Sequence, residues 1–339
     1  MADKINVGVI GAGRIGRVHA ENLVYRMPEA RLAGVSDVFV EAAERLAGEL
    51  GGVPAYQDPR RILDDPDVDA VLICSSTDTH APLIEQAAQA GKQIFCEKPI
   101  ALELAAIDRA LAAADEAGVK LQIGFNRRFD PNFGRVHDLV AAGEVGTPHL
   151  LRITSRDPAP PPIAYVRVSG GIFLDMMIHD FDMARFLMPG EVESVYAAAA
   201  VLVDPAIGEA GDVDTAIVTL HFDDGSIGAI DNSRQAVYGY DQRVEVFGSG
   251  GSVSADNAYP NTVMLGNAHR VQRDLPLNFF MDRYVESYVR ELRAFISAVL
   301  DDVPPPVTGH DGRVPVVIGY AAKKSVAEGR PVKLSEVNA

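Results

Sequence analysis

Residues 5–16 have the sequence INVGVIGAGRIG, in which a short apolar run ends in three glycines spaced G-x-G-x-x-G. A helical pattern over residues 15–26 follows at once, and a strand before the string with a helix after it is the context that a dinucleotide-binding turn requires. The first glycine permits the tight bend, the second lets the backbone approach a pyrophosphate, and the third lets the helix pack closely on the strand. The helix N-terminus then offers N–H groups to the phosphates. The cofactor contacts predicted in this turn are Gly11, Gly13, Arg14, Ile15 and Gly16.

A second apolar run, residues 31–36, ends at Asp37. This is about twenty residues beyond the glycines, where an acidic side chain bonds the ribose hydroxyls of NAD. Apolar residues and then Glu41 follow, and negative charge at this point repels the 2′-phosphate of NADP. We therefore predict NAD rather than NADP as the cofactor. The structural alternative is a glycine turn with a surface aspartate and no ligand.

Composition limits the classes of function. A length of 339 residues suggests two domains, and 47% hydrophobic residues can form substantial cores. The formal net charge of −16 argues against nucleic acid or an anionic membrane as a partner. The N-terminus does not resemble a secretory signal, and no apolar run reaches the ~18 residues of a membrane span. Cys74 and Cys96 fall in predicted buried strands and form neither a disulfide framework nor a metal cluster. We expect a cytoplasmic protein without a bound metal.

Strand and helix patterns alternate over residues 1–125, as in a parallel, doubly wound sheet. Polar residues follow two of the predicted strands directly, at 75–80 and 97–99. Because ligands lie outside the carboxyl ends of strands in open α/β sheets, both segments are expected near the cofactor. The predicted strands are 5–10, 31–36, 70–74, 93–96 and 120–125, and the predicted helices are 15–26, 40–50, 80–90 and 102–117.

The pattern changes in the second predicted domain, residues 126–339, to an α+β arrangement with a large, mostly antiparallel open sheet. Short turn signals such as the Asp-Asp-Gly at 223–225 separate alternating segments, which is typical of a meander. The predicted strands are 148–156, 192–203, 213–223, 226–232, 242–247 and 261–266, and the predicted helices are 131–142, 281–300 and 310–328.

Asp175 and His179 lie four residues apart in the segment DMMIHDFDM, whose pattern predicts a helix. Side chains at this spacing are neighbours on one helix face. A neutral imidazole can accept a proton from a hydroxyl near neutral pH, and a nearby carboxylate can orient the ring. The spacing alone is equally compatible with a helix-capping aspartate beside an ordinary, partly buried histidine.

Lys98 follows a predicted strand and precedes a proline. At the carboxyl end of a strand beside a nicotinamide, a lysine can donate a hydrogen bond to a substrate hydroxyl. A lysine before a proline is otherwise a solvated loop residue.

Taken together, these motifs resemble the family of glucose–fructose oxidoreductase and inositol dehydrogenase. The resemblance extends over essentially the whole chain: GAGRIG, then Glu-Lys-Pro at 97–99, then GFNRRFD at 124–130, then DMMIHD at 175–180. The segments SRDPAPPP at 155–162 and YGYD at 238–241 are most similar to the bacterial inositol 2-dehydrogenases of that family.

The resemblance implies a role for each matching position. Lys98, Asp175 and His179 form the catalytic set, with His179 as the base. Arg127, Asp157 and Tyr238 line the polyol site together with Asp175 and His179. Further cofactor contacts are Ser75, Thr77, His80, Glu97 and Lys98.

The resemblance also implies the reaction and the assembly. The expected activity is NAD-dependent oxidation of a ring hydroxyl of myo-inositol to the ketone, in a homotetramer or a dimer. Another inositol isomer, an aldose or a sugar acid is the alternative substrate. Two alternatives differ in the class of function. One is an NAD-binding sensor that has lost catalysis, and the other is an enzyme that uses NAD to cleave a glycosidic bond.

Overall fold

The computed structural model describes residues 4–337, which form two compact units. The first contains residues 4–129 and 286–314, and the second contains residues 130–285 and 315–337. The chain therefore leaves the first unit near the predicted boundary at 125/126 and later returns to it. Each unit is described by itself below.

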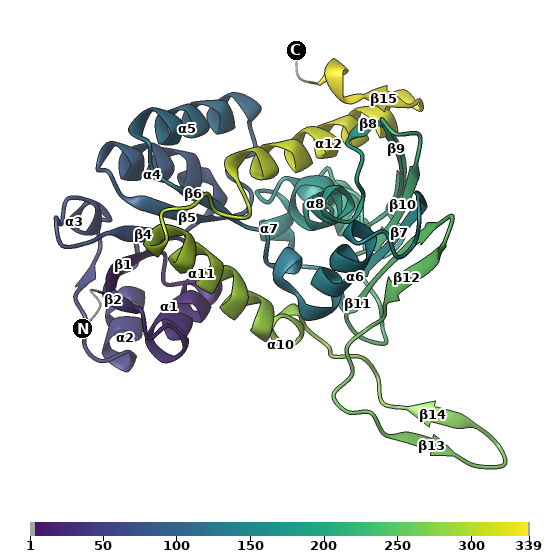
Figure 1. The fold of residues 1–339 in the computed structure, drawn as a ribbon, viewed down its shortest axis with the longest axis horizontal. Helices are drawn as coiled ribbons and strands as arrows, with labels where there is room; N and C mark the ends of the chain where they lie inside the picture. Colours follow the sequence, from purple (N-terminus) through teal and green to yellow (C-terminus); the bar gives the residue numbers. More distant parts are fainter. Residues whose placement is uncertain (1–3, 338–339) are drawn as a thin grey trace. The chain divides into compact units, whose positions relative to one another are not determined.

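The first unit is built on a six-stranded parallel sheet in the order β3-β2-β1-β4-β5-β6 (Figure 1). The chain order reverses between β1 and β4, and ligands bind at such a switch point in doubly wound folds. The five predicted strands are present, and β3, which has only two residues, is additional. The strands are β1 (Ile5–Ile10), β2 (Ala30–Ser36), β3 (Ala55–Tyr56), β4 (Ala70–Ile73), β5 (Gln93–Glu97) and β6 (Leu121–Gly124).

Helix α11 contributes to the core of this unit although it comes from far along the chain. Its residues Leu292, Phe295 and Ile296 are fully buried and belong to the same hydrophobic cluster as the β1 and β2 side chains. The helices of the unit are α1 (Arg14–Arg26), α2 (Val40–Glu49), α3 (Arg60–Leu63), α4 (Thr77–Gln89), α5 (Leu104–Ala117) and α11 (Val285–Leu300), with the 3-10 turn η1 (Asn126–Phe129) and the start of α12 (Gly309–Glu328).

The second unit is built on a seven-stranded sheet in the order β12-β11-β7-β10-β9-β8-β15. The β7–β10 pair is parallel and the other pairs are antiparallel, which confirms the predicted fold class. The strands are β7 (Pro148–Arg156), β8 (Val192–Ala200), β9 (Thr215–Phe222), β10 (Ile227–Ser233), β11 (Asp241–Gly248), β12 (Gly251–Ala255) and β15 (Val332–Lys333); β13 (Met264–Gly266) and β14 (Val271–Arg273) form a separate ribbon.

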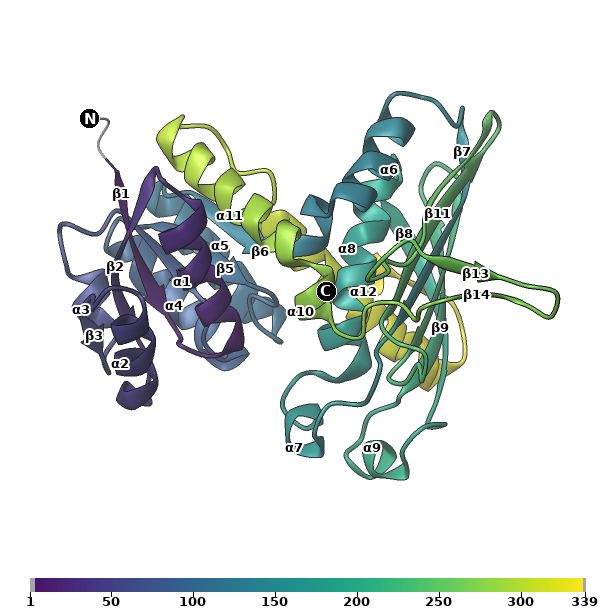
Figure 2. The same cartoon turned by 90° about the horizontal axis from the view of Figure 1, so that it is seen from below.

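Helices α6 and α8 cover one face of this sheet (Figure 2). The other face carries large apolar side chains that stay exposed, among them Ile217 and Phe247 at 59% and 45%. The remaining helical elements are α6 (Pro131–Ala141), α7 (Ile163–Val166), the π-helix η2 (Ile172–Met176), α8 (Ile178–Leu187), α9 (Pro205–Glu209), α10 (Phe280–Arg283), the rest of α12, and η3 (Leu334–Glu336).

Two predicted elements differ in the structure. The helix predicted at 281–300 is two helices, because Tyr284 leaves the helical backbone and its buried ring packs edge-to-face on Tyr240. The strand predicted at 261–266 is reduced to the three residues of β13, which pair only with β14. In the described part of the chain, no helix is both long and apolar enough to span a bilayer.

Candidate active site

The glycine turn after β1 has the geometry that a dinucleotide needs. Gly11 has a φ of 103°, and a Cβ there would lie 2.6 Å from the backbone of Cys74. A Cβ on Gly16 would lie 1.8 Å from the Gly11 carbonyl oxygen, so only glycine lets α1 approach so closely. A Cβ on Gly13 would meet nothing within 4 Å. The turn is therefore closed at its first and third glycines and open at its second, where a pyrophosphate would lie at the start of α1.

Asp37 lies directly against this turn. One carboxylate oxygen accepts the Ala12 N–H at 2.7 Å, and the other accepts the Phe39 N–H at 2.9 Å. The neighbouring Val38 and Phe39 side chains are 69% and 73% exposed, so the surface beside the carboxylate is apolar. A ribose diol suits this surface, whereas a 2′-phosphate would meet a negative charge. The residues of the turn and Asp37 together fit NAD.

His80 joins two turns at the carboxyl edge of the sheet. Its Nδ1 lies 2.8 Å from the carbonyl oxygen of Pro99, and its Nε2 lies 3.1 Å from that of Ser75. The ring is 2% exposed, and burial lowers the pKa of His80. A neutral His80 ring donates to only one of these two carbonyl oxygens, but it packs between the turn after β4 and the Lys98–Pro99 turn. Its direct contact with a cofactor stays a prediction. Thr77, predicted to contact the cofactor, begins α4.

Glu97 is the last residue of β5 and Lys98 follows it directly, and both residues are partly exposed. Glu97 forms a 2.8 Å hydrogen bond with Nε2 of His19 from α1. The structure thus gathers the predicted cofactor residues of this unit at the carboxyl ends of β1, β2, β4 and β5. Arg127 belongs to the same unit, where its side chain is 5% exposed within η1.

Asp175 and His179 lie in the second unit, on a helical segment that is irregular. Asp175 belongs to the π-helical turn η2, and His179 belongs to the α-helix that follows. Both oxygens of Asp212 accept the N–H of Ile172, at 3.0 and 3.1 Å, so Asp212 holds the start of this segment. Asp175 lies inside η2 and not at an N-cap position, which Gly171 and Met177 occupy. Its carboxylate accepts hydrogen bonds from Tyr165 at 2.9 Å and Arg234 at 3.2 Å.

Arg234 is the main residue of this cluster that the sequence analysis did not identify. Its side chain is 2% exposed and faces three carboxylates. Its guanidinium nitrogens lie 3.2 Å from Asp175, 3.9 Å from Asp212 and 4.0 Å from Asp157. Asp157 and Asp175, which are both predicted to bind the polyol, therefore lie around the same buried positive charge. The only signal in the sequence is an arginine directly after the strand at 227–233, a position that parallels Asp157 after β7.

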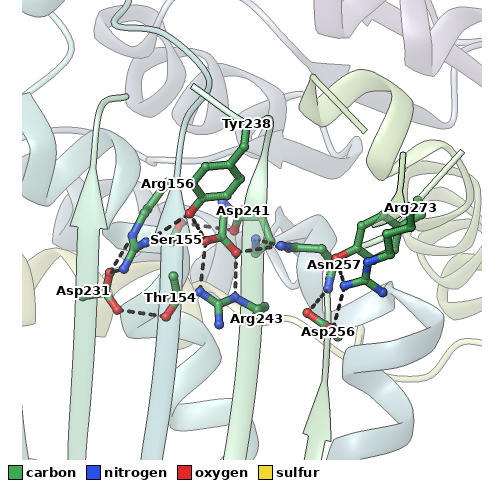
Figure 3. A network of polar contacts seen from close by, with 12 residues as sticks. Thr154, Ser155, Arg156, Asp231, Tyr238, Asp241, Arg243, Asp256, Asn257 and Arg273 are labelled. Atoms are coloured by element: carbon green, nitrogen blue, oxygen red, sulfur yellow. Dashed lines mark hydrogen bonds and ion pairs between the residues drawn. The ribbon is translucent and has the colours of Figure 1, made fainter. Parts of the chain in front are cut away.

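Tyr238 is engaged in another network of the second unit (Figure 3). Its hydroxyl donates to Asp241 at 2.5 Å and accepts from Arg156 at 3.1 Å. Burial and the bond to Asp241 raise the pKa of Tyr238. Arg156 also pairs with Asp231 on the open face of the sheet. The structure therefore does not show Tyr238 in the Asp175 cluster, and its contact with a polyol stays a prediction.

Comparison with known proteins identifies the family. The model of the "Oxidoreductase family, NAD-binding Rossmann fold" matches residues 5–125, and that of the "GFO/IDH/MocA C-terminal domain" matches residues 133–254. The chain belongs to the GFO/IDH/MocA family. It is an NAD-dependent oxidoreductase, as the glycine turn and Asp37 predict.

Full-length relatives within this family are similar in both sequence and fold. The chain is 54% identical to myo-inositol 2-dehydrogenase of Thermotoga maritima over 98% of this chain and 99% of that protein. It is 46% identical to inositol 2-dehydrogenase of Rhizobium meliloti over 98% and 99%. A crystal structure of scyllo-inositol dehydrogenase from Lactobacillus casei with bound NAD(H) and scyllo-inositol has a TM-score of 0.91 at 29% identity, covering 98% of this chain and all of that chain.

Proposed function

We propose that this GFO/IDH/MocA oxidoreductase oxidises a ring hydroxyl of myo-inositol to the inosose, with NAD as the oxidant. The observation that carries the substrate assignment is the 54% identity, over nearly all of both chains, to the T. maritima myo-inositol 2-dehydrogenase. NAD, when bound, accepts the hydride of the carbinol carbon. The protein must then position the hydroxyl and remove its proton.

In the proposed mechanism, His179 accepts the hydroxyl proton. Its half-buried ring lies one helical turn from Asp175, which suits a base that must remain accessible to substrate. A neutral imidazole accepts a proton effectively near neutral pH. Asp175 orients the polyol and the imidazole, and Arg234 and Tyr165 hold the Asp175 carboxylate in place.

Lys98 donates a hydrogen bond to the reacting oxygen in this proposal and stabilises the negative charge that develops there. Asp157, Arg127 and Tyr238 supply further hydrogen bonds to the ring hydroxyls. A neutral polyol has no charge to recognise, so its affinity and orientation depend on such directional contacts.

Another inositol isomer is the second candidate substrate, favoured by the fold shared with the L. casei scyllo-inositol dehydrogenase. The isomers differ only in the orientation of a hydroxyl. An aldose or a sugar acid ranks behind them, and an NAD-binding sensor ranks last, because Lys98 and His179 are both present.

We also propose that the enzyme is a homo-oligomer, a tetramer or a dimer, joined through the open face of its seven-stranded sheet. This face carries exposed Tyr196, Ile217 and Phe247 among charges of both signs. Its hollow is lined by Arg152 and Arg243 as well as by Asp231, Glu245 and Asp256. A surface with both apolar and paired opposite charges is complementary to a second copy of itself across a twofold axis. The expected cytoplasmic location, with its NAD pool, stays a prediction.

The substrate proposal is tested by following NADH formation with purified protein, NAD and a panel of myo-, scyllo- and chiro-inositol, glucose and xylose. We expect the highest kcat/KM with myo-inositol. A higher kcat/KM for another isomer would correct the substrate, and an inactive protein that still binds NAD would favour the sensor. Release of the aglycone from an aryl glycoside would indicate glycosidic cleavage instead.

A further inference from the structure

The first unit buries a cluster of titratable side chains beneath the Glu97–Lys98 turn. The cluster consists of His19 from α1, Glu97 from the end of β5 and Glu291 from α11, with one polar atom of each within 4.8 Å of the others. The side chains of His19 and Glu291 are fully buried, whereas that of Glu97 is 13% exposed. Glu97 is therefore the member that reaches the surface of this unit, and the two others lie behind it.

His19 is hydrogen-bonded to Glu97 but lies too far from Glu291 for a hydrogen bond. His19 Nε2 lies 2.8 Å from Glu97 but 3.9 Å from Glu291. Neither carboxylate oxygen of Glu291 has a hydrogen-bond partner among residues 4–337. The surroundings are aromatic, since Phe95 and Tyr288 both pack edge-to-face against the imidazole ring. Glu291 thus points a carboxyl group into the cluster without the donors that an ionised carboxylate needs.

Burial decides which groups in and around this cluster carry a charge. A buried carboxylate without donors is more stable as the neutral acid. Burial, and then the charge of Glu97, raise the pKa of Glu291 well above its ordinary value. Cys74 and Cys96 also face the cluster, and burial raises the pKa of both thiols. His80 also interacts electrostatically with Glu97, and burial lowers the pKa of His80, so this ring adds no positive charge near the cluster at neutral pH.

We propose that Glu291 is held as a neutral acid, and that His19 and Glu291 together position the carboxylate of Glu97 beside Lys98 at the cofactor edge of the sheet. The Nε2 atom of His19 carries at most one proton. When Glu291 is neutral, the Nε2–H group of His19 donates its hydrogen bond to Glu97. When Glu291 is ionised, it competes for the same N–H group and weakens the hydrogen bond to Glu97. Glu291 is thus a positioning residue, and its action on the cofactor depends on the proposed place of Glu97 in the NAD site.

The first test measures stability against pH without any ligand. Glu291→Gln keeps the shape of the neutral acid but cannot ionise. Since the raised pKa makes the folded wild type retain a proton that the unfolded chain loses above about pH 4.5, the wild type loses stability relative to the variant as pH rises from 5 to 9. We expect the Tm of Glu291→Gln minus that of the wild type to increase steadily over this range. A difference that does not change with pH would overturn the proposal.

The second test measures NAD binding by isothermal titration calorimetry at pH 7 and pH 9. Glu291→Gln should bind NAD within about twofold of the wild type at pH 7 and should lose less affinity at pH 9. His19→Leu, which removes the donor to Glu97, should bind NAD about tenfold more weakly at both pH values, the loss of one charge-assisted hydrogen bond. Equal loss of affinity in Glu291→Gln and His19→Leu would overturn the proposal, because it would mean that an ionised Glu291 is needed.

Two measurements on the wild type keep the proposal falsifiable if a variant does not fold. Infrared spectra at neutral pH should show a protonated carboxylic acid, and its absence would contradict a neutral Glu291. A stoichiometric divalent metal in the purified protein would show instead that the cluster is a metal site. The stability and infrared results do not depend on the substrate. A protein that passes them and binds NAD but oxidises no inositol would refute only the proposed function.

Discussion

The two units present their functional groups in different ways. At the cofactor edge of the first unit, the shape of the main chain is what the predicted cofactor site depends on: a glycine turn, a helix N-terminus, and two turns with His80 between them. Around Asp175 in the second unit, the surface is made of charged side chains from separate strands and helices, held by the buried Arg234. A main-chain site depends on local geometry, whereas a side-chain cluster depends on how distant segments fold together.

If the first unit binds NAD and His179 removes the proton, substitution of His179 should have the largest effect on turnover. His179→Ala should lower kcat by about 10²–10⁴, the usual contribution of a general base, and leave NAD affinity unchanged. Steady-state kinetics and calorimetry with NAD measure the two quantities separately. The matched control is His137→Ala in the same unit, where the ring stacks on Phe186 and should be dispensable for turnover. Near-wild-type turnover of His179→Ala would mean that another group removes the proton.

Substitution of Arg234, which holds Asp175, should have a smaller effect on catalysis than substitution of His179. Arg234→Met should reduce kcat/KM for the polyol about 10–100-fold, because Asp175 loses a charge-assisted hydrogen bond of about 1.5–3 kcal/mol and three carboxylates are left facing one another. NAD affinity should stay within twofold. Arg330→Met, which removes exposed ion pairs and a hydrogen bond to the Pro331 carbonyl oxygen, is the control and should retain full activity. A parallel loss of NAD affinity in Arg234→Met would contradict a role of Arg234 confined to the polyol site.

If the glycine turn binds NAD through its main chain, a single added methyl group should weaken NAD binding at Gly16 but not at Gly48. Gly16→Ala places a Cβ against the Gly11 carbonyl oxygen and should weaken NAD binding about tenfold, with a strain cost of about 1–3 kcal/mol. Gly48→Ala adds a Cβ in open space on α2 and should raise the Tm, since alanine is the better helix former by about 0.5–1 kcal/mol. Calorimetry and thermal melts would compare both variants, and equal NAD affinities would contradict the close approach of α1.

A substitution on the open face of the sheet should have the smallest effect on catalysis and a large effect on the oligomeric state. Ile217→Asp places a charge on the proposed interface, where Ile217 is 59% exposed in the single chain. Sedimentation velocity should show a shift toward smaller species, while NAD affinity stays unchanged. Val237→Asp, at a side chain 88% exposed in the loop before β11, is the matched control. An unchanged sedimentation coefficient for Ile217→Asp would place the interface elsewhere or leave the protein monomeric.

The sequence predicted most of the first unit because its signals are local. Glycine spacing, apolar runs and the polar residues after strands all act within a few positions, so the turn and Asp37 could be found directly. Helix α11 could not be assigned to this unit, since its amphipathic pattern does not identify the core on which it packs. Glu291 escaped notice for the same reason, because it meets His19 only after the chain returns.

The second unit was predicted in outline but not in its charged interior. Alternation identified β7 to β11, because one face of each is buried. The contacts of Arg234 with Asp157, Asp175 and Asp212 join segments between 22 and 77 residues apart, and no spacing rule covers such distances. The π-turn at Asp175 also has no clear sequence pattern. The four-residue spacing therefore identified Asp175 and His179 as neighbours but not the residues that hold Asp175.

The central claim, that this enzyme transfers a hydride from an inositol ring carbon to NAD, is tested most directly with myo-inositol deuterated at C2. The NADH formed would be isolated and its isotopic content measured by mass spectrometry. We predict one deuterium per NADH, carried on the nicotinamide ring. NADH formed from this substrate without deuterium would show that the hydride comes from another carbon, and absence of any NADH would contradict the proposed reaction with myo-inositol.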